Sequence, residues 1–156
     1  IYVFLLWFPF IIVTVYMHDL LEDLFVRNPE LCDVELPKIS VYSPKNGQTL
    51  KIINHTIIMD LNLSVKDNTV IAEVKVVPAR KNLRSSLTLG HTLICGVKEL
   101  TTLYHNFVSI ASYSISETIT LNITALGITP GRYLLVVWAR DIAGNERAYY
   151  VEFVVR

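Results

Sequence analysis

The two cysteines are the side chains most able to react in this sequence of 156 residues. Cys32 and Cys95 could form a disulfide in an oxidising compartment, closing a loop of about 63 residues and stabilising the fold by roughly 4 kcal/mol. The alternative is two unrelated thiols, one exposed and one buried. A zinc site built from Cys95, His91 and His105 is disfavoured, because no second cysteine lies near them. The sequence therefore predicts a Cys32–Cys95 disulfide and no metal.

Three Asn-x-Ser/Thr sequons, at Asn54, Asn62 and Asn122, are candidate sites for N-linked glycans. Apolar residues occupy the odd positions of 56–66 and 118–124, so Asn62 and Asn122 are expected to face outward from strands. Asn54 precedes the first of these strands. All three could carry a glycan without disturbing a core. Threonine-rich outer faces of ordinary strands would give the same pattern, which is the alternative to glycosylation.

Oxygen-bearing side chains occur in two predicted loops. Asp67 and Asn68 belong to one loop, and Asp141, Asn145 and Glu146 to the other. In a sandwich both loops would fall at the same end, where their oxygen atoms could bind Ca²⁺. Turn formation explains each of these residues without an ion. We therefore predict no metal ion and no cofactor.

Sequence motifs of catalysis are absent: the chain contains no GxSxG, HExxH, P-loop or dinucleotide-binding pattern. Its 14 basic and 14 acidic residues give a net charge of zero, which argues against a nucleic-acid partner. The sequence thus predicts a protein that is not an enzyme and does not bind nucleic acid.

The elements that must position these residues begin with residues 1–17, an apolar run without charge. A spanning helix needs ~20 apolar residues, and an apolar stripe continues through residues 20–25. We therefore predict one helix over residues 1–28, first hydrophobic and then amphipathic, ended by Asn28-Pro29. A cleaved secretory signal fits less well, because a basic n-region and a small-residue cleavage site are both missing. Residues 1–27 are expected to contact membrane lipid or identical subunits.

Charge is divided unevenly along the chain. Residues 18–37 contain six acids and one base, whereas residues 38–156 contain thirteen bases and eight acids. A flank so poor in bases is typical of the extracytoplasmic side of a membrane helix. We expect residues 29–38 to form an acidic linker that holds a domain, residues 39–156, at the cell surface. The linker is either a solvated stalk or a segment that docks on a neighbouring subunit's basic domain.

Residues 39–156 read as short strands separated by turn signals. Strands are expected at 39–42, 56–66, 70–77, 87–95, 107–115, 118–124, 132–140 and 147–155. Helical periodicity is lacking after residue 30. This pattern predicts a mainly β fold, an Ig-like antiparallel β-sandwich of about seven strands preceded by the N-terminal hydrophobic α-helix.

Two segments carry a family resemblance: ISVYSPKNGQTL at residues 39–50 and LGITPGRYLLVVWARDIAGN at residues 126–145. Through them, residues 39–156 resemble immunoglobulin-like and fibronectin type III-like modules of bacterial and archaeal surface proteins. The resemblance implies a spacer, adhesive or accessory role. In such a fold Tyr133 would reach back with its hydroxyl to backbone near Leu126. Residues 80–102 depart from the pattern, because they are longer and less regular than usual.

The predicted strand 132–140 is apolar on both faces, so one apolar row is left over whichever face meets the core. Strands 70–77 and 147–155 are its expected neighbours. The extra row is covered either by the stalk or segment 80–102 of the same chain, or by a partner. Trp138 and Tyr150 would anchor such an interface. The candidate interface residues are Leu134, Val136, Trp138, Tyr150 and Val154.

Three functions remain open. The first is a non-catalytic cell-surface module for structure or adhesion, held by the N-terminal helix and binding a protein or glycan through its sandwich. The second is a filament subunit resembling an archaeal type IV pilin, with apolar helices bundled inside and β domains outside. The apolar start favours the filament, while Pro9, the short helix and Leu5, where many bacterial pilins carry Glu, argue against it. The third is an accessory module of a larger exported hydrolase.

Overall fold

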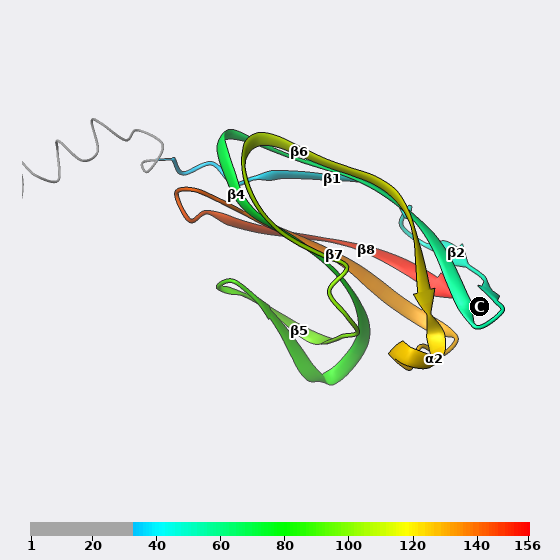
Figure 1. Cartoon of the computed structure of the whole chain (residues 1–156). Helices are drawn as coiled ribbons and strands as arrows, with labels where there is room; N and C mark the ends of the chain where they lie inside the picture. Colours follow the sequence, from blue (N-terminus) through cyan, green and yellow to red (C-terminus); the bar gives the residue numbers. More distant parts are fainter. Residues whose placement is uncertain (1–32) are drawn as a thin grey trace, which may run out of the picture. The chain divides into compact units, whose positions relative to one another are not determined.

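The computed structural model describes residues 33–156, so the predicted helix over residues 1–28 lies outside the described part. The predicted mainly β fold is confirmed: eight strands form one mixed, strongly curled sheet shaped like a half-barrel (Figure 1). The main path of the sheet is β1-β4-β7-β8-β2, and β3, β5 and β6 also pair with β4. The elements are β1 (Lys38–Ser43), β2 (Gln48–Leu50), β3 (Ile52–Ile53), β4 (Thr56–Leu89), β5 (Thr92–Glu99), β6 (Tyr104–Asn122), α2 (Ile123–Leu126), β7 (Gly131–Asp141) and β8 (Glu146–Val155).

The long strand β4 turns the corner that curls the sheet. Its first part, residues 56–66, pairs with β1 and with the second half of β6, whereas residues 71–80 pair with β7. The register shifts between Lys66 and Ile71, which marks a bulge. A bulge bends a strand without ending it. The predicted strands 56–66 and 70–77 are therefore parts of one strand. The predicted strands 107–115 and 118–124 are likewise joined in β6, except that β6 ends at Asn122 and residues 123–124 begin α2.

The sheet differs from the predicted sandwich in two further respects. The prediction placed two antiparallel sheets face to face, whereas the structure has one sheet that curls over its own core. In addition, β2 pairs with β8 in parallel. The expected neighbours of strand 132–140 are confirmed, since β7 pairs with residues 71–80 of β4 on one side and with β8 on the other. Within residues 33–156, no helix combines the length and apolar character needed to cross a bilayer.

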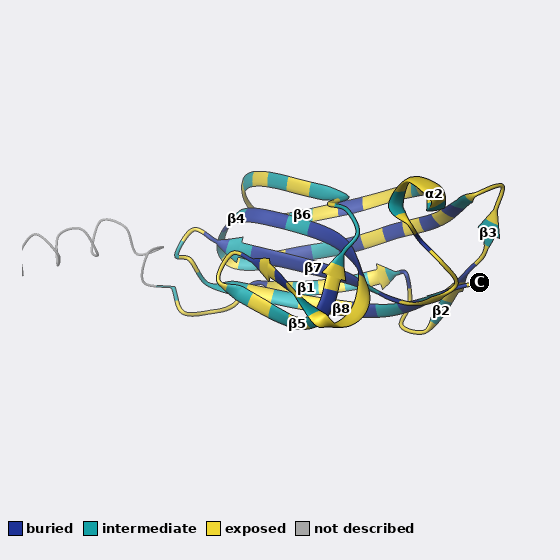
Figure 2. Cartoon of the chain, turned by 90° about the horizontal axis from the view of Figure 1, so that it is seen from below, coloured by how far each residue is buried: buried dark blue, intermediate teal, exposed yellow. Residues whose placement is uncertain are grey.

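The main core lies on the inner face of the curl. Alternate residues of β4 from Ile57 to Val65 are buried, and those between them face outward, which is the predicted alternation (Figure 2). These side chains pack against one row of β7, from Tyr133 to Ala139. Burial of alternate residues fixes the strand register, because a shift by one residue would expose the whole apolar row.

A second core cluster lies on the other face of β7. The hairpin formed by residues 79–99, which we call the cover hairpin, folds over the second apolar row. Its Leu87, Leu89 and Val97 pack with the fully buried Val136 and Trp138. We predicted that this row is covered either by a segment of the same chain or by a partner, and the structure shows that a segment of the same chain covers it. The predicted strand 87–95 was wrong at its centre, since Gly90 forms the turn of this hairpin.

The predicted tyrosine contact is present at a slightly different place. The Tyr133 hydroxyl donates to the carbonyl oxygen of Thr129 at 2.6 Å and accepts from the Thr129 backbone N–H at 2.9 Å. The chain between β6 and β7 begins with α2, a single turn. The side chain of Asn122 caps this turn by accepting from the Ala125 N–H. These bonds hold the loop before β7 close to the base of the cover hairpin, where the cleft described below lies.

Candidate functional site

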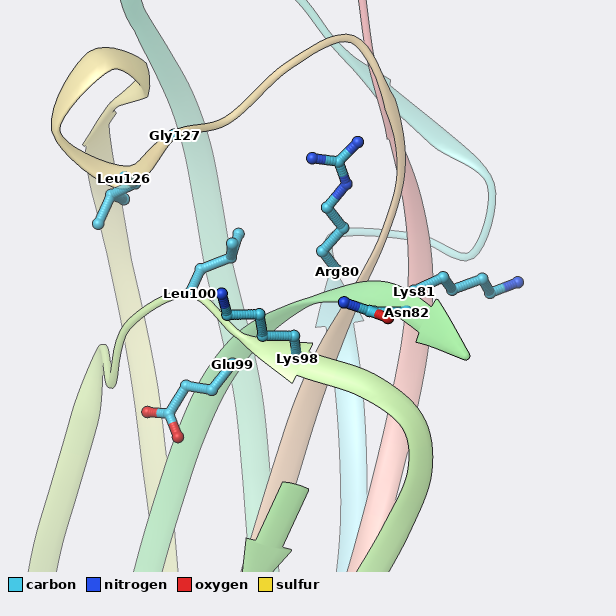
Figure 3. Close-up of a pocket in the computed structure, with 8 residues that line it drawn as sticks. All are labelled: Arg80, Lys81, Asn82, Lys98, Glu99, Leu100, Leu126 and Gly127. Carbon is cyan, nitrogen blue, oxygen red and sulfur yellow. The ribbon is translucent and has the colours of Figure 1, made fainter. Parts of the chain in front are cut away.

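A polar cleft lies where the cover hairpin leaves the sheet, and it is the candidate binding site of the described domain. The cleft is a cavity of about 570 Å³ between the base of the hairpin and the loop after α2 (Figure 3). We call it the basic cleft, because three of the eight residues that line it are cationic. Its lining residues are Arg80, Lys81, Asn82, Lys98, Glu99, Leu100, Leu126 and Gly127.

Strand pairing places two of these cations side by side. Arg80 and Lys98 are direct partners in the antiparallel ladder between β4 and β5, so their side chains leave the same side of the sheet. Figure 3 shows the Arg80 guanidinium directed toward the loop that follows Gly127 and the Lys98 ammonium directed toward Leu100. Like charges at directly opposed positions are destabilising in a sheet. No ion pair with a carboxylate of residues 33–156 is found for either cation.

The carboxylates nearest to this part of the hairpin are already engaged. Lys81 donates to Glu152 at 2.6 Å, and Arg132 donates to the other oxygen of Glu152 at 3.2 Å. The hydrogen bond from Lys81, together with the charges of Lys81 and Arg132, lowers the pKa of Glu152. Glu99 accepts from the Thr102 hydroxyl at 2.7 Å, and in Figure 3 its carboxylate points away from the Arg80 guanidinium. The cleft therefore keeps an excess of positive charge.

The predicted glycan sites are all exposed. Asn62 lies on the outer face of β4, Asn54 lies in the turn before β4, and Asn122 ends β6. Asn54 adopts a left-handed backbone conformation with φ 48°, which asparagine tolerates better than most residues. The structure thus leaves all three residues exposed, and the outward positions of Asn62 and Asn122 agree with the alternation of apolar residues.

The predicted disulfide partners are described only in part. Cys95 is an exposed free cysteine of β5, and Cys32 lies outside the described residues. No disulfide is present within residues 33–156. The zinc alternative is not assembled there, since Cys95, His91 and His105 form no group able to share a metal ion. Instead, each histidine contacts a different carboxylate: His91 lies 3.0 Å from Glu146 and His105 lies 2.6 Å from Glu73.

The two oxygen-rich loops do meet at one end of the domain. Carboxylate oxygens of Asp67 and Asp141 lie within 4.8 Å of each other. Asp141 accepts from the backbone and side-chain nitrogens of Asn145 at 2.8 and 2.7 Å, so turn formation accounts for it. Asp67 binds Thr69 through one oxygen, while its other oxygen is buried without a hydrogen-bond partner.

A buried polar cluster around Glu73 was missed by sequence reasoning. Glu73, only 5% exposed, binds His105 at 2.6 Å, Arg140 at 2.7 Å and Lys75 at 3.4 Å. Burial raises the pKa of Glu73, but the hydrogen bonds from His105 and Lys75 and the nearby cations outweigh it, so the pKa is lowered. The signal was present in the sequence, because Glu73 interrupts an apolar strand in phase with Ile71 and such a carboxylate requires cationic partners.

Glu146, one of the loop residues considered as a Ca²⁺ ligand, instead forms hydrogen bonds with the cover hairpin. It accepts from the His91 N–H at 2.8 Å and the Thr92 hydroxyl at 3.1 Å, and the Trp138 indole N–H lies 3.4 Å away. Burial raises its pKa, whereas these hydrogen bonds lower it below the ordinary value. Glu146 thereby fastens the tip of the cover hairpin to β8 and Trp138.

The candidate interface residues are divided by the cover hairpin. Val136 and Trp138 are fully buried inside the second core cluster, and Leu134 packs against its edge. Val154 is half-buried in β8, while Tyr150 remains 55% exposed. The predicted anchor Trp138 is therefore inaccessible to a partner, because residues 79–99 already cover it.

Comparisons with known proteins identify no family. No family model matches the sequence, and the search of curated proteins found no match. Among solved structures, the chain is similar to OgpA from Akkermansia muciniphila, with 11% identity and a TM-score of 0.44 over 78% of this chain and 28% of that chain. A late embryogenesis abundant protein matches with 13% identity and a TM-score of 0.36, over 91% and 83% of the two chains. A β-glucosidase from Kluyveromyces marxianus matches with 11% identity and a TM-score of 0.35, over 79% and 16%.

Proposed function

We propose that residues 39–156 form a non-catalytic module of the cell surface, displayed outside the membrane by the N-terminal segment and serving structure or adhesion. The exposure of all three sequon asparagines is the observation that supports this proposal best. A secreted domain with three acceptor sequences must present each where a glycan leaves the core intact. The resemblance of residues 39–156 to Ig-like surface modules points the same way.

The outer face of the sheet adds a second line of support. Most outward residues of β4 and β6 around Asn62 and Asn122 are polar, with the exposed Ile58 as an exception, and Thr118 donates to Asp60 at 2.8 Å across the strands. Asn122 pairs with Thr56, which is the last residue of the Asn54 sequon. Glycans on this face would cover mostly polar surface, and none of the three asparagines lines the basic cleft.

The second apolar row of β7 gives no support to the filament alternative. An uncovered second apolar row would have favoured subunit packing, but the cover hairpin buries Val136 and Trp138 within the chain. What still favours a filament is the apolar character of residues 1–17 alone. We therefore place the surface module first, with the filament subunit second and the accessory module of an exported hydrolase third.

Surface labelling and glycan mapping test the proposal together. In cells that produce the full chain, a membrane-impermeant amine reagent should label its lysines, and the protein should remain with membranes until detergent is added. Substitutions N54Q, N62Q and N122Q should each remove the mass of one glycan. The matched control N82Q changes an exposed asparagine outside any sequon and should leave the glycan mass unchanged. An unlabelled protein without glycans in the cytosolic fraction would refute the proposal.

A further inference from the structure

We propose that the basic cleft binds an acidic carbohydrate, a saccharide that carries sulfate, phosphate or carboxylate groups. This inference names a ligand for the adhesive role proposed above and rests on that role only for the setting in which the ligand is met. Its physical basis is the cleft itself: a cavity of about 570 Å³ whose charge is not balanced by the fold.

The paired cations Arg80 and Lys98 give the first argument. They are direct partners in one rung of the ladder, and neither forms an ion pair with a carboxylate of the described residues. An anionic group placed between a guanidinium and an ammonium removes their repulsion and makes charge-assisted hydrogen bonds with both. The neighbouring Lys81 forms an ion pair with Glu152, which also pairs with Arg132, and this ion pair holds Lys81 beside the cleft. The cleft thus offers a pair of exposed cations without an ion-pair partner among residues 33–156, and a third cation at its rim.

Size and lining indicate what carries the anionic group. A cavity of about 570 Å³ is in the range of small-molecule sites, and it is far too large for a bare sulfate or phosphate ion. The Asn82 amide can bond to hydroxyl groups. Leu100 and Leu126, which pack against the main core, add an apolar surface for the carbon atoms of a sugar ring. These groups together suit a polyhydroxylated anion.

The same lining disfavours nucleic acid, the other common polyanion. None of the described residues that line the cleft is aromatic, so unpaired bases would find no ring on which to stack. Acidic carbohydrate is the class that the cleft fits, and nucleic acid becomes an outcome that the experiment can detect.

Binding of size-defined saccharides to the full chain in nonionic detergent tests the inference. The probes are a heparin-derived hexasaccharide, a hexamer of galacturonic acid and a phosphorylated mannose trisaccharide, each matched with its neutral counterpart. Isothermal titration should detect binding of at least one acidic probe and of none of the neutral ones. The double variant R80Q/K98Q should weaken that binding at least tenfold. The control K66Q/R147Q removes two exposed cations from other parts of the domain and should change it less than twofold.

Amide shifts of the unaltered protein give a readout that does not depend on the variants. Addition of the bound probe should shift the signals of residues 80–82, 98–100 and 126–127 more than those of the sequon face. Failure of all acidic probes, tighter binding of a nucleic-acid strand, or full binding by R80Q/K98Q would overturn the inference. None of these results bears on surface labelling or glycan mass, so failure here is distinct from failure of the proposed function.

Discussion

Substitution of Gly90 by alanine tests how tightly the cover hairpin is fastened to the sheet. Gly90 has φ +57°, and a Cβ atom there would lie 2.5 Å from Cζ2 of Trp138 and closer still to Oε1 of Glu146. Neither neighbour can yield cheaply. Trp138 is fully buried, and Glu146 already holds the His91 N–H and the Thr92 hydroxyl. The new methyl group must therefore displace part of the second core cluster.

The expected loss has two parts. A non-glycine residue in the left-handed region costs about 1 kcal/mol, and inserting a methyl group into a filled site costs about 1–3 kcal/mol more. Gly90→Ala should thus lower the free energy of unfolding by about 2–4 kcal/mol. The matched control is Gly96→Ala, because Gly96 has φ +76° but a Cβ there meets nothing within 4 Å. Gly96→Ala should lower the free energy of unfolding only by the cost of its left-handed backbone conformation, about 1 kcal/mol.

Equilibrium unfolding in urea, followed by far-UV circular dichroism of the full chain in nonionic detergent, measures both values. A change in midpoint at constant slope reports stability alone. Equal destabilisation by the two substitutions would refute the reasoning, because it would mean that the hairpin tip is not held against Trp138 and Glu146. A loss by Gly96→Ala larger than that by Gly90→Ala would refute it as well.

The other two predictions each concern one polar side chain, Glu73 or Tyr133. The cations around Glu73 hold its pKa below the ordinary 4.5, so its stabilising contribution is present above that value and is lost as the pH falls through the lower folded pKa. Glu73→Gln should therefore flatten the decline in urea midpoint as the pH falls below about 5, and an unchanged profile would contradict the ion-pair geometry. Tyr133→Phe removes both hydrogen bonds to Thr129 and should cost about 1–3 kcal/mol in the same assay. A neutral effect would show that the loop before β7 is held by other contacts.

Local alternation in the sequence was sufficient to predict the main core. The odd residues of 56–66 and the two faces of 132–140 are buried as predicted, and the neighbours of the latter strand are also confirmed. These features depend on period-two burial, which each strand displays by itself. The hydrogen bond from the Tyr133 hydroxyl to nearby backbone was likewise predictable, since its partner Thr129 lies only four residues away in the chain.

The corners of the sheet could not be predicted by the same means. Asp67, Asn68 and Thr69 are residues that favour a turn between two strands, and they equally suit the bulge that keeps β4 continuous. The choice between them depends on whether β6 and β7 are present to pair with both sides of the bend. The parallel pairing of β2 with β8 is also set at long range, because it joins residues 48–50 to residues 153–155.

The cover hairpin has little regular alternation in its sequence, yet it buries the second apolar row of β7 and forms one side of the basic cleft. Residues 82–85 form an irregularity between its base and its tip, so the segment carries no continuous alternation and reads as loop. The tip beyond the irregularity supplies the apolar side chains that hide Trp138. The base before it places Arg80 opposite Lys98, at the point where β4 leaves the main core. One bend in one hairpin therefore closes an apolar surface and exposes a cationic one. A partner of this domain would accordingly meet charge at the base of the hairpin, whereas Trp138, the anchor that the sequence alone suggested, is buried under its tip.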